Sequence, residues 1–313
     1  MYMRLAGKFF KTKGFKQLNN KALVGFLCGL GAASIWGGMY VVSKVVLEVI
    51  PPFMLLAIRL ALGFLALGAV IWVRNSKSNT LPALSKRELW QSLLVGILGY
   101  GISLGFQFSG TKLSTASNGS LITSATPAFV LLFATFILHE TSSTRRVIAL
   151  VISTIGVLAV VDPRTAELSP SLFLGNILLF AAGLTWALYS VLVRKVARNI
   201  DLLISSSVML LGGLPSSILL GIGEIRSQGI GAITPGIIGG ILFLGIISTA
   251  VAMFLWNYAF AVLPATTASL TFFAQPVVGT LLGWFFLGEK ITPLFLVGGV
   301  LIGIGILIST RET

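Results

Sequence analysis

The sequence predicts an all-α polytopic membrane protein, with ten transmembrane helices arranged as a 5+5 inverted-topology repeat. Composition is the first reason: the chain of 313 residues is 56% hydrophobic and only 10% charged, whereas a soluble domain carries about 25% charged residues. The second reason is a series of apolar runs about 20 residues long, the length that crosses a bilayer, joined by short connections. The third reason is an internal repeat.

The repeat is clearest in two segments of 25 residues, 116–140 and 265–289. Ungapped pairing of the two segments gives nine identical positions, among them Pro127 with Pro276, and both segments end in a glutamate. Matches at offsets of 150 or 149 residues extend the repeat: Gly25, Trp36 and Val41 match Gly175, Trp186 and Val191, and Gly156 matches Gly305. Because each half has an odd number of spans, the second half is predicted to enter the membrane from the opposite side.

The helix boundaries are predicted from the apolar runs and from the prolines, glycines and charges that interrupt them. In chain order, the expected helices cover residues 22–46, 52–73, 89–109, 114–138, 146–161, 172–193, 202–222, 236–261, 264–287 and 293–309. The first repeat is therefore 22–161 and the second is 172–309. A basic cytoplasmic tail at 1–21, with six lysines and arginines and no acid, precedes them.

The distribution of lysine and arginine predicts the orientation. With the N-terminus in the cytoplasm, the inner segments hold 16 of these residues and the outer segments hold five. The positive-inside rule therefore predicts a multi-pass membrane protein with both termini in the cytoplasm. The same distribution accounts for the net charge of +13, so no nucleic-acid partner is inferred.

What the spans lack argues against catalysis. All nine acidic residues lie at span ends, in connections or in the tail, so no mid-membrane carboxylate is available as a proton carrier. The one histidine, His139, and the one cysteine, Cys28, are too isolated for a metal site, a catalytic triad or a disulfide. The chain also has no glycine-rich phosphate-binding loop. We therefore expect no enzyme activity, no cofactor, no metal and no direct ATP drive.

Pro127 and Pro276 fall near the centres of the fourth and ninth predicted spans. Each proline removes one backbone hydrogen bond and frees the carbonyl four residues earlier, at Thr123 and Phe272. Free carbonyls at mid-membrane are tolerated where they face a cavity or a polar partner. We expect two kinked helices that line a central site, and the alternative is a structural kink with no ligand contact.

Aromatic and polar side chains inside the spans are the candidate substrate contacts. Two aromatic pairs, Trp36 with Tyr40 and Trp186 with Tyr189, have spacings of three or four residues, so each pair shares a helix face. Such rings can enclose an amphiphilic solute, and amides, which are costly to bury in hydrocarbon, can bind its polar part. The polar candidates are Gln107, Asn118, Thr123, Asn257 and Gln275. The alternatives are core or lipid packing for the rings and interhelical hydrogen bonds for the polar groups.

Arg59 is the only charged residue well inside a predicted span, seven residues past Pro52 and so roughly 10 Å deep. An unpaired arginine in lipid costs at least about 2.5 kcal/mol, which makes it a functional candidate. It could attract a substrate carboxylate or close an outer gate. The alternative is that its side chain snorkels outward or caps carbonyls of a neighbouring helix.

Four stretches carry a resemblance to a known family: SIWGGMYVVSK at 34–44, PPFMLLAIR ending at Arg59, TPAFVLLFATFILHE ending at Glu140, and QPVVGTLLGWFFLGE ending at Glu289. They resemble the EamA-like members of the drug/metabolite transporter superfamily, which have two five-helix repeats. The resemblance implies an inner-membrane carrier, often an exporter of amino acids or other small metabolites, with a central cavity between the halves.

The resemblance also implies roles for particular residues. The equivalents of Arg59, Pro127, Glu140, Pro276 and Glu289 belong to the shared pattern and are expected to serve folding or gating. The first tail departs from the pattern, because it ends in His139 and Glu140 where the second tail has the more usual glycine and glutamate.

The sequence therefore favours a secondary transporter, an exporter or facilitator of a small metabolite such as an amino acid or an amphiphilic solute, acting by alternating access. Since no acid is buried, facilitated diffusion or exchange is expected in place of proton coupling. The alternative hypothesis is a non-transporting membrane scaffold or lipid-handling subunit with a dry, packed centre. The expected partners are the lipid bilayer and a small-molecule substrate, and homo-oligomer formation stays open.

Overall fold

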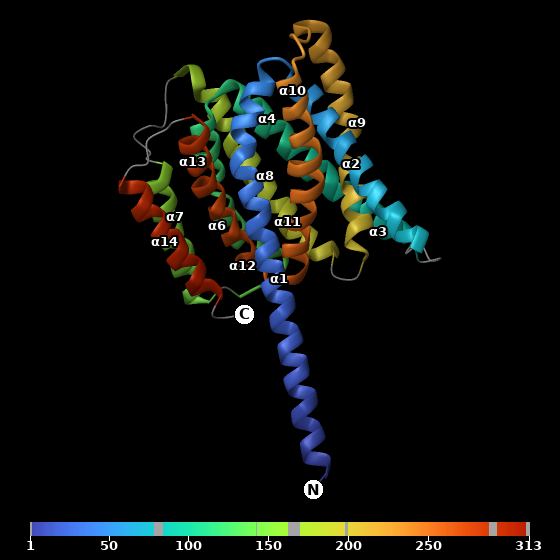
Figure 1. Cartoon of the computed structure of the whole chain (residues 1–313), viewed down its shortest axis with the longest axis vertical. Coiled ribbons are helices and arrows are strands. Elements are labelled where there is room, and N and C mark those ends of the chain that lie inside the picture. The colour runs from blue at the N-terminus through green and yellow to red at the C-terminus, as the bar shows by residue number, and fades with distance from the viewer. Residues whose placement is uncertain are drawn as a thin grey trace.

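Within the residues described, the protein is a bundle of ten helical rods (Figure 1). The computed structural model describes residues 2–77, 84–141, 143–161, 170–197, 200–287 and 293–310. At its N-terminal end, the first helix projects beyond the bundle (Figure 1).

The first repeat contributes five rods, of which the third and fourth consist of consecutive segments. In chain order the segments are α1 (Tyr2–Leu47), α2 (Pro52–Lys77), α3 (Lys86–Gly96), η1 (Ile97–Ser103), α4 (Leu104–Leu113), α5 (Ala116–Thr123), α6 (Thr126–Ile137) and α7 (Thr144–Val161). The segment η1 is a π-helix that joins α3 to α4, and these three segments form the third rod. The segments α5 and α6 form the fourth rod.

The second repeat has the same plan. After a short 3-10 turn, η3 (Pro170–Leu172), its segments are α8 (Phe173–Val196), α9 (Leu202–Gln228), α10 (Pro235–Leu242), η5 (Phe243–Val251), α11 (Ala252–Val262), α12 (Ala265–Leu270), η6 (Thr271–Phe273), α13 (Ala274–Leu287) and α14 (Pro293–Thr310). The predicted all-helical fold is confirmed, although α9 continues six residues past its expected end at residue 222.

The surface of the bundle is suited to lipid. Seven helices in the described ranges are long and apolar enough to cross a membrane, and two shorter apolar helices cover Leu121–Ile137 and Pro293–Ile308. Large apolar side chains such as Trp72, Leu219 and Phe285 are exposed on the outside, while many serines and threonines are buried inside. An apolar exterior around a polar interior is the arrangement that a bilayer favours.

The helical pattern is irregular just before each of the two mid-span prolines. A turn at Ser124 and Ala125 separates α5 from α6, and Pro127 is the second residue of α6. A 3-10 segment separates α12 from α13, and Pro276 is the third residue of α13. These irregular turns lie where the sequence predicts kinks. Each proline follows its turn because it has no N–H and is best accommodated in a first helical turn, where N–H groups lack helical partners anyway.

The packing of the rods confirms the inverted repeat. The helix α1 packs against α11 and α13, and its counterpart α8 packs against α4 and α6. The pairs α2 with α9 and α7 with α14 join equivalent rods of the two repeats. Gly156 lies beside Gly298, whereas Gly305, further along α14, lies beside Ala149, so α7 and α14 run antiparallel. Figure 1 shows α7 and α14 on one side of the bundle, α2, α3 and α9 on the other, and α1 between them.

Glycines allow the closest contacts between the repeats. A Cβ atom on Gly96 of α3 would lie 2.6 Å from the Cα atom of Met209 in α9, and one on Gly213 would lie 2.6 Å from the carbonyl carbon of Tyr100. These neighbours are backbone atoms, which cannot move without shifting a whole helix. Close backbone approach is a main source of helix association in membranes, where the hydrophobic effect between helices is absent.

We predict that Gly96→Ala lowers the melting temperature of the purified protein, because its methyl group forces α3 away from α9. Overpacking of this kind costs about 1–3 kcal/mol. Gly68→Ala in α2 is the matched control, since a Cβ atom there meets nothing within 4 Å. Detergent-solubilised variants would be heated and the folded fraction measured by size-exclusion chromatography. Equal melting temperatures for the two variants would contradict the packing described here.

Candidate functional site

A cavity lies where the two repeats meet, and both repeats supply its walls. The space open to the centre of a water molecule is about 30 Å³, enough for an ordered water but small for an organic solute. The lining residues are Trp36, Met39, Ser103, Leu104, Gln107, Thr123, Thr126, Ala182, Gly183, Trp186, Met253, Phe272 and Gln275.

Half of the predicted substrate contacts line this cavity. They are Trp36, Gln107, Thr123, Trp186 and Gln275. The other five candidates do not line it: Tyr40, Arg59, Asn118, Tyr189 and Asn257 are placed elsewhere in the interior. Several of these five support the lining residues through hydrogen bonds or ring contacts, so the cavity has an organised polar surrounding.

The aromatic wall joins equivalent tryptophans of the two repeats. The rings of Trp36 in α1 and Trp186 in α8 meet edge to face, with centroids 5.5 Å apart. Trp256 and Phe272 extend the cluster, with centroids 5.3 and 6.2 Å from Trp36. Trp256 was not a sequence candidate, and its place in α11 opposite α1 is a consequence of the inverted packing.

Two polar atoms at the cavity are left without partners. The indole N–H of Trp36 donates to the Ser248 carbonyl oxygen at 3.1 Å. By contrast, Nε1 of Trp186 and Oε1 of Gln275 are buried and have no hydrogen-bond partner among the described residues. Since a buried polar group without a partner is costly, a hydrogen bond from either atom to a ligand or to water would be stabilising.

Tyr40 organises the polar side of the cavity from behind. Its hydroxyl lies 3.0 Å from Oγ1 of Thr123 and accepts a 2.8 Å hydrogen bond from Nε2 of Gln107. Thr123 also donates to the Gly119 carbonyl oxygen at 2.6 Å. These contacts fix the orientation of two lining side chains.

Tyr189 and Asn257 belong to a second network, behind Trp186. The Tyr189 hydroxyl donates to Oδ1 of Asn257 at 2.6 Å and lies 2.5 Å from the Tyr100 hydroxyl. Nδ2 of Asn257 donates to Oγ of Ser206 at 3.1 Å. The ring of Tyr189 packs on Trp186 with centroids 4.6 Å apart, so this network holds the tryptophan in place.

Arg59 is completely buried, and it does not reach outward to the membrane surface. Its Nε donates to Oγ1 of Thr249 at 2.8 Å, and Nη2 donates to Oγ of Ser248 at 3.4 Å. Nη1 lies 3.8 Å from Sδ of Met39, and the guanidinium carbon sits 4.8 Å from the centre of the Phe108 ring. The guanidinium is thus one side chain away from the cavity, behind Met39.

Asn118 lies at the end of the bundle where α1 and α4 end and α5 begins. Its Nδ2 donates to Oδ1 of Asn176 at 3.0 Å and to Oγ of Ser114 at 3.2 Å. Lys44 lies at the same end and donates to the carbonyl oxygens of Ser114 at 2.7 Å and Thr111 at 3.1 Å.

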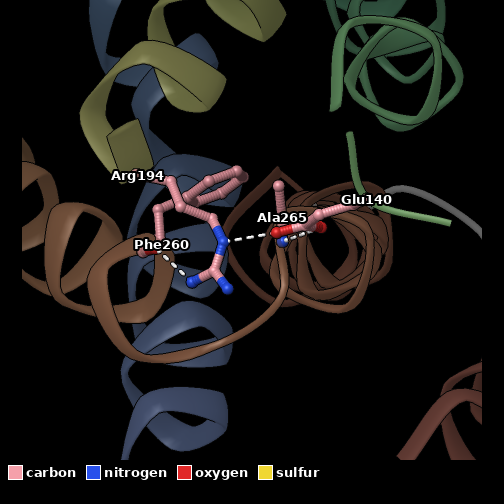
Figure 2. Close-up of polar contacts among 4 residues, drawn as sticks. All are labelled: Glu140, Arg194, Phe260 and Ala265. Atoms are coloured by element: carbon pink, nitrogen blue, oxygen red, sulfur yellow. Dashed lines mark hydrogen bonds and ion pairs between the residues drawn. The ribbon is translucent and has the colours of Figure 1, made fainter. Parts of the chain in front are cut away.

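At the opposite end of the bundle, Glu140 joins the two repeats, and Figure 2 shows its contacts. Its Oε1 accepts from Nε of Arg194 at 2.5 Å, and its Oε2 accepts from the backbone N–H of Ala265 at 3.0 Å. Arg194 also donates to the Phe260 carbonyl oxygen at 3.2 Å (Figure 2). A carboxylate that follows the first repeat's α6 therefore holds the start of α12 and the end of α8 in the second repeat. Its repeat partner, Glu289, lies outside the described residues.

The cations at the two ends are equivalent in the repeat. Arg194 follows Lys44 by 150 positions, and Phe260 follows Thr111 by 149. Each cation donates to a carbonyl oxygen near the end of the third rod of its own repeat. This role of Lys44 and Arg194 was not predicted from the sequence. The signal was present, because the two residues pair when the repeat alignment is followed eight residues beyond Trp36 and Trp186.

The described residues contain no cluster of three or more histidine, cysteine, aspartate or glutamate side chains that could hold a metal ion. The side chains at the cavity offer ring contacts and hydrogen bonds, and the buried Arg59 cation lies behind Met39.

The chain is similar in sequence to known transporters and in fold to a solved structure. The chain is 25% identical over 278 residues to the uncharacterized transporter YoaV of Bacillus subtilis, an alignment that covers 88% of this chain and 93% of the relative. It is 26% identical over 298 residues to the probable amino-acid metabolite efflux pump of Salmonella typhimurium, covering 91% and 94%. A crystal structure with 21% sequence identity has a TM-score of 0.76, over 92% of this chain and 96% of that chain, and shares its fold.

The model of the EamA-like transporter family matches the chain twice, at residues 23–162 and 173–311. Together, the two matches cover most of the sequence and correspond to the two halves of the bundle. The chain therefore belongs to the EamA-like transporter family and is a multi-pass membrane transporter, not an enzyme.

Proposed function

We propose that this transporter moves a small amphiphilic metabolite, such as an amino acid, through the central cavity by alternating access. The observation that carries the proposal is the pair of unpartnered polar atoms, Nε1 of Trp186 and Oε1 of Gln275, in a cavity walled by both repeats. The rings of Trp36, Trp186 and Phe272 suit the apolar body of a solute. The name of the Salmonella typhimurium relative, an amino-acid metabolite efflux pump, supports this solute class and the direction of export.

We predict that Trp186→Phe and Gln275→Leu each weaken ligand binding about tenfold, because each removes one hydrogen-bonding group and keeps most of the side-chain volume. The ligand would be the compound that most raises the melting temperature of the purified protein in a metabolite library. Isothermal titration would then give the dissociation constants. The control is Trp72→Phe, which alters an exposed tryptophan on the outer surface. Unchanged affinity in both cavity variants would show that the ligand binds somewhere other than this cavity.

The Glu140 contacts support a gate at one end of the cavity. All six residues of α12 are buried, and the Glu140 carboxylate joins the start of this helix to Arg194. Opening this end requires α6 and α12 to separate, which breaks the ion pair. With both termini in the cytoplasm, as the lysine and arginine distribution favours, this gate is the cytoplasmic one. In the same proposal, Lys44, the repeat equivalent of Arg194, belongs to the outer gate.

We predict that Glu140→Gln favours the state that is open to the cytoplasm, because charged hydrogen bonds of the closed state are lost. The reporter is Thr267→Cys, a buried position in α12, in a Cys28→Ser background. Labelling by a membrane-impermeant maleimide in inside-out vesicles should become roughly tenfold faster. Glu88→Gln, at a helix start remote from α12, is the control. Unchanged labelling would contradict the gate, and faster labelling only in right-side-out vesicles would contradict the orientation.

We propose facilitated diffusion or exchange as the mode of transport, because the acids in the described ranges lie at helix ends. The polar groups at the cavity are amides, hydroxyls and indole N–H groups, which do not ionise at physiological pH and so cannot carry a proton across the membrane. Counterflow of labelled solute into preloaded proteoliposomes should therefore persist when a protonophore removes any pH gradient. Flux that disappears with the protonophore would contradict this mode.

A further inference from the structure

Building on the proposed function, we infer that Arg59 is a specificity-determining residue: it favours substrates with an anionic group, and Met39 is the side chain between the guanidinium and the cavity. Arg59 is a fully buried charged residue that does not itself line the cavity.

The charge of Arg59 is not compensated by any acid in the described ranges. Its contacts are with neutral groups, namely two hydroxyls, one thioether and one aromatic ring. The buried or half-buried acids are engaged elsewhere: Glu140 binds Arg194, Asp201 binds Arg74, and Glu224 accepts from the backbone N–H groups of Phe53 and Met54. The bundle therefore keeps a net positive charge near its centre.

A cation held this way attracts an anion without touching it. In the interior of a protein, where the effective dielectric constant is far below that of water, two charges interact more strongly at a given distance than they do in water. Protein dipoles such as the hydroxyls of Ser248 and Thr249 stabilise the guanidinium only in part. A substrate that enters with a negative charge lowers the free-energy cost of keeping the Arg59 cation buried.

Two routes connect Arg59 to the cavity wall. Met39 lines the cavity and lies 3.8 Å from Nη1 of Arg59 through its sulfur atom. Ser248 accepts from Nη2 of Arg59 through its hydroxyl and from the indole of Trp36 through its carbonyl oxygen. Methionine is flexible and adapts its shape to its surroundings. Rotation of Met39 is therefore the step by which we expect an anionic group to come near the guanidinium.

The favoured substrate class is an organic anion or zwitterion with an apolar body. The apolar part would contact Trp36 and Phe272, and the negative group would lie on the Met39 side of the cavity. A neutral or purely cationic analogue of the same size lacks the attraction and is expected to bind less tightly.

The test compares two matched probe pairs that differ at the carboxylate: phenylacetate with phenylacetamide, and L-phenylalanine with L-phenylalaninamide. Isothermal titration of the purified full chain gives the ratio of affinities, anion over amide, for each pair. Wild-type protein should prefer the anion. Arg59→Gln should reduce the ratio roughly tenfold, whereas Arg59→Lys, which keeps the charge, should retain most of it.

Because removal of a fully buried side chain can unfold the protein, a second pair of variants leaves Arg59 in place. Met39→Ala opens the space between the cavity and the guanidinium and should increase the preference for the anion. Met253→Ala is its matched control, since Met253 also lines the cavity but makes no hydrogen bond with Arg59. Equal ratios in these two variants would contradict the role of Met39 and Arg59.

The outcomes separate this inference from the proposed function. If the probes bind but their affinity ratio is the same in wild type and in folded Arg59→Gln, the inference is wrong and the central binding site stands. A wild-type preference for the amides would also overturn it. If none of the four probes binds, both the inference and the proposed solute class fail.

Discussion

The structure depends on one constraint: polar groups that are buried away from water must find partners inside the protein, and here the partner repeatedly comes from the other repeat. Arg59 binds Thr249, Ser92 binds Ser205, and Tyr100 binds Tyr189. The ion pairs of Arg74 with Asp201 and of Arg194 with Glu140 also cross between the halves. Neither half can satisfy these groups alone. The interface between the repeats is therefore both the main source of cohesion and the place where a polar site can exist inside the membrane.

The central cavity is one place in the described part of the chain where this constraint is not met. Trp186 and Gln275 each bury a polar atom that has no partner among the described residues, although their neighbours Tyr40, Tyr189 and Asn257 have two or more hydrogen bonds. A binding site needs polar groups without a partner, surrounded by side chains whose own hydrogen bonds are complete. The hydrogen-bonded neighbours hold the unpartnered groups in position. A ligand that forms hydrogen bonds with Trp186 and Gln275 would supply stabilisation that the protein alone does not provide.

The π-helical segments η1 and η5 show how the two repeats adjust the same rod. They occupy the middle of the third rod in each half, and such irregular turns often occur at functional sites. In η5, the Thr249 hydroxyl donates to the Leu244 carbonyl oxygen at 2.7 Å and accepts from Arg59. In η1, Gly99 lies against the ring of Tyr189. The irregular turns thus lie beside the buried arginine and beside the tyrosine network that supports Trp186.

The sequence by itself determined the membrane environment, the ten spans, the inverted repeat and the family resemblance, because apolar length, charge distribution and internal identity act along the chain. It also identified the tryptophans on which the cavity centres. Only the tertiary structure decided which polar residues face the cavity. Gln275 and Asn257 look alike in the sequence, as single amides within a span, but Asn257 meets Tyr189 and Ser206 while Oε1 of Gln275 meets no partner among the described residues. The difference depends on helices that are distant in the chain, and a helical period specifies a face but not the neighbour that it meets.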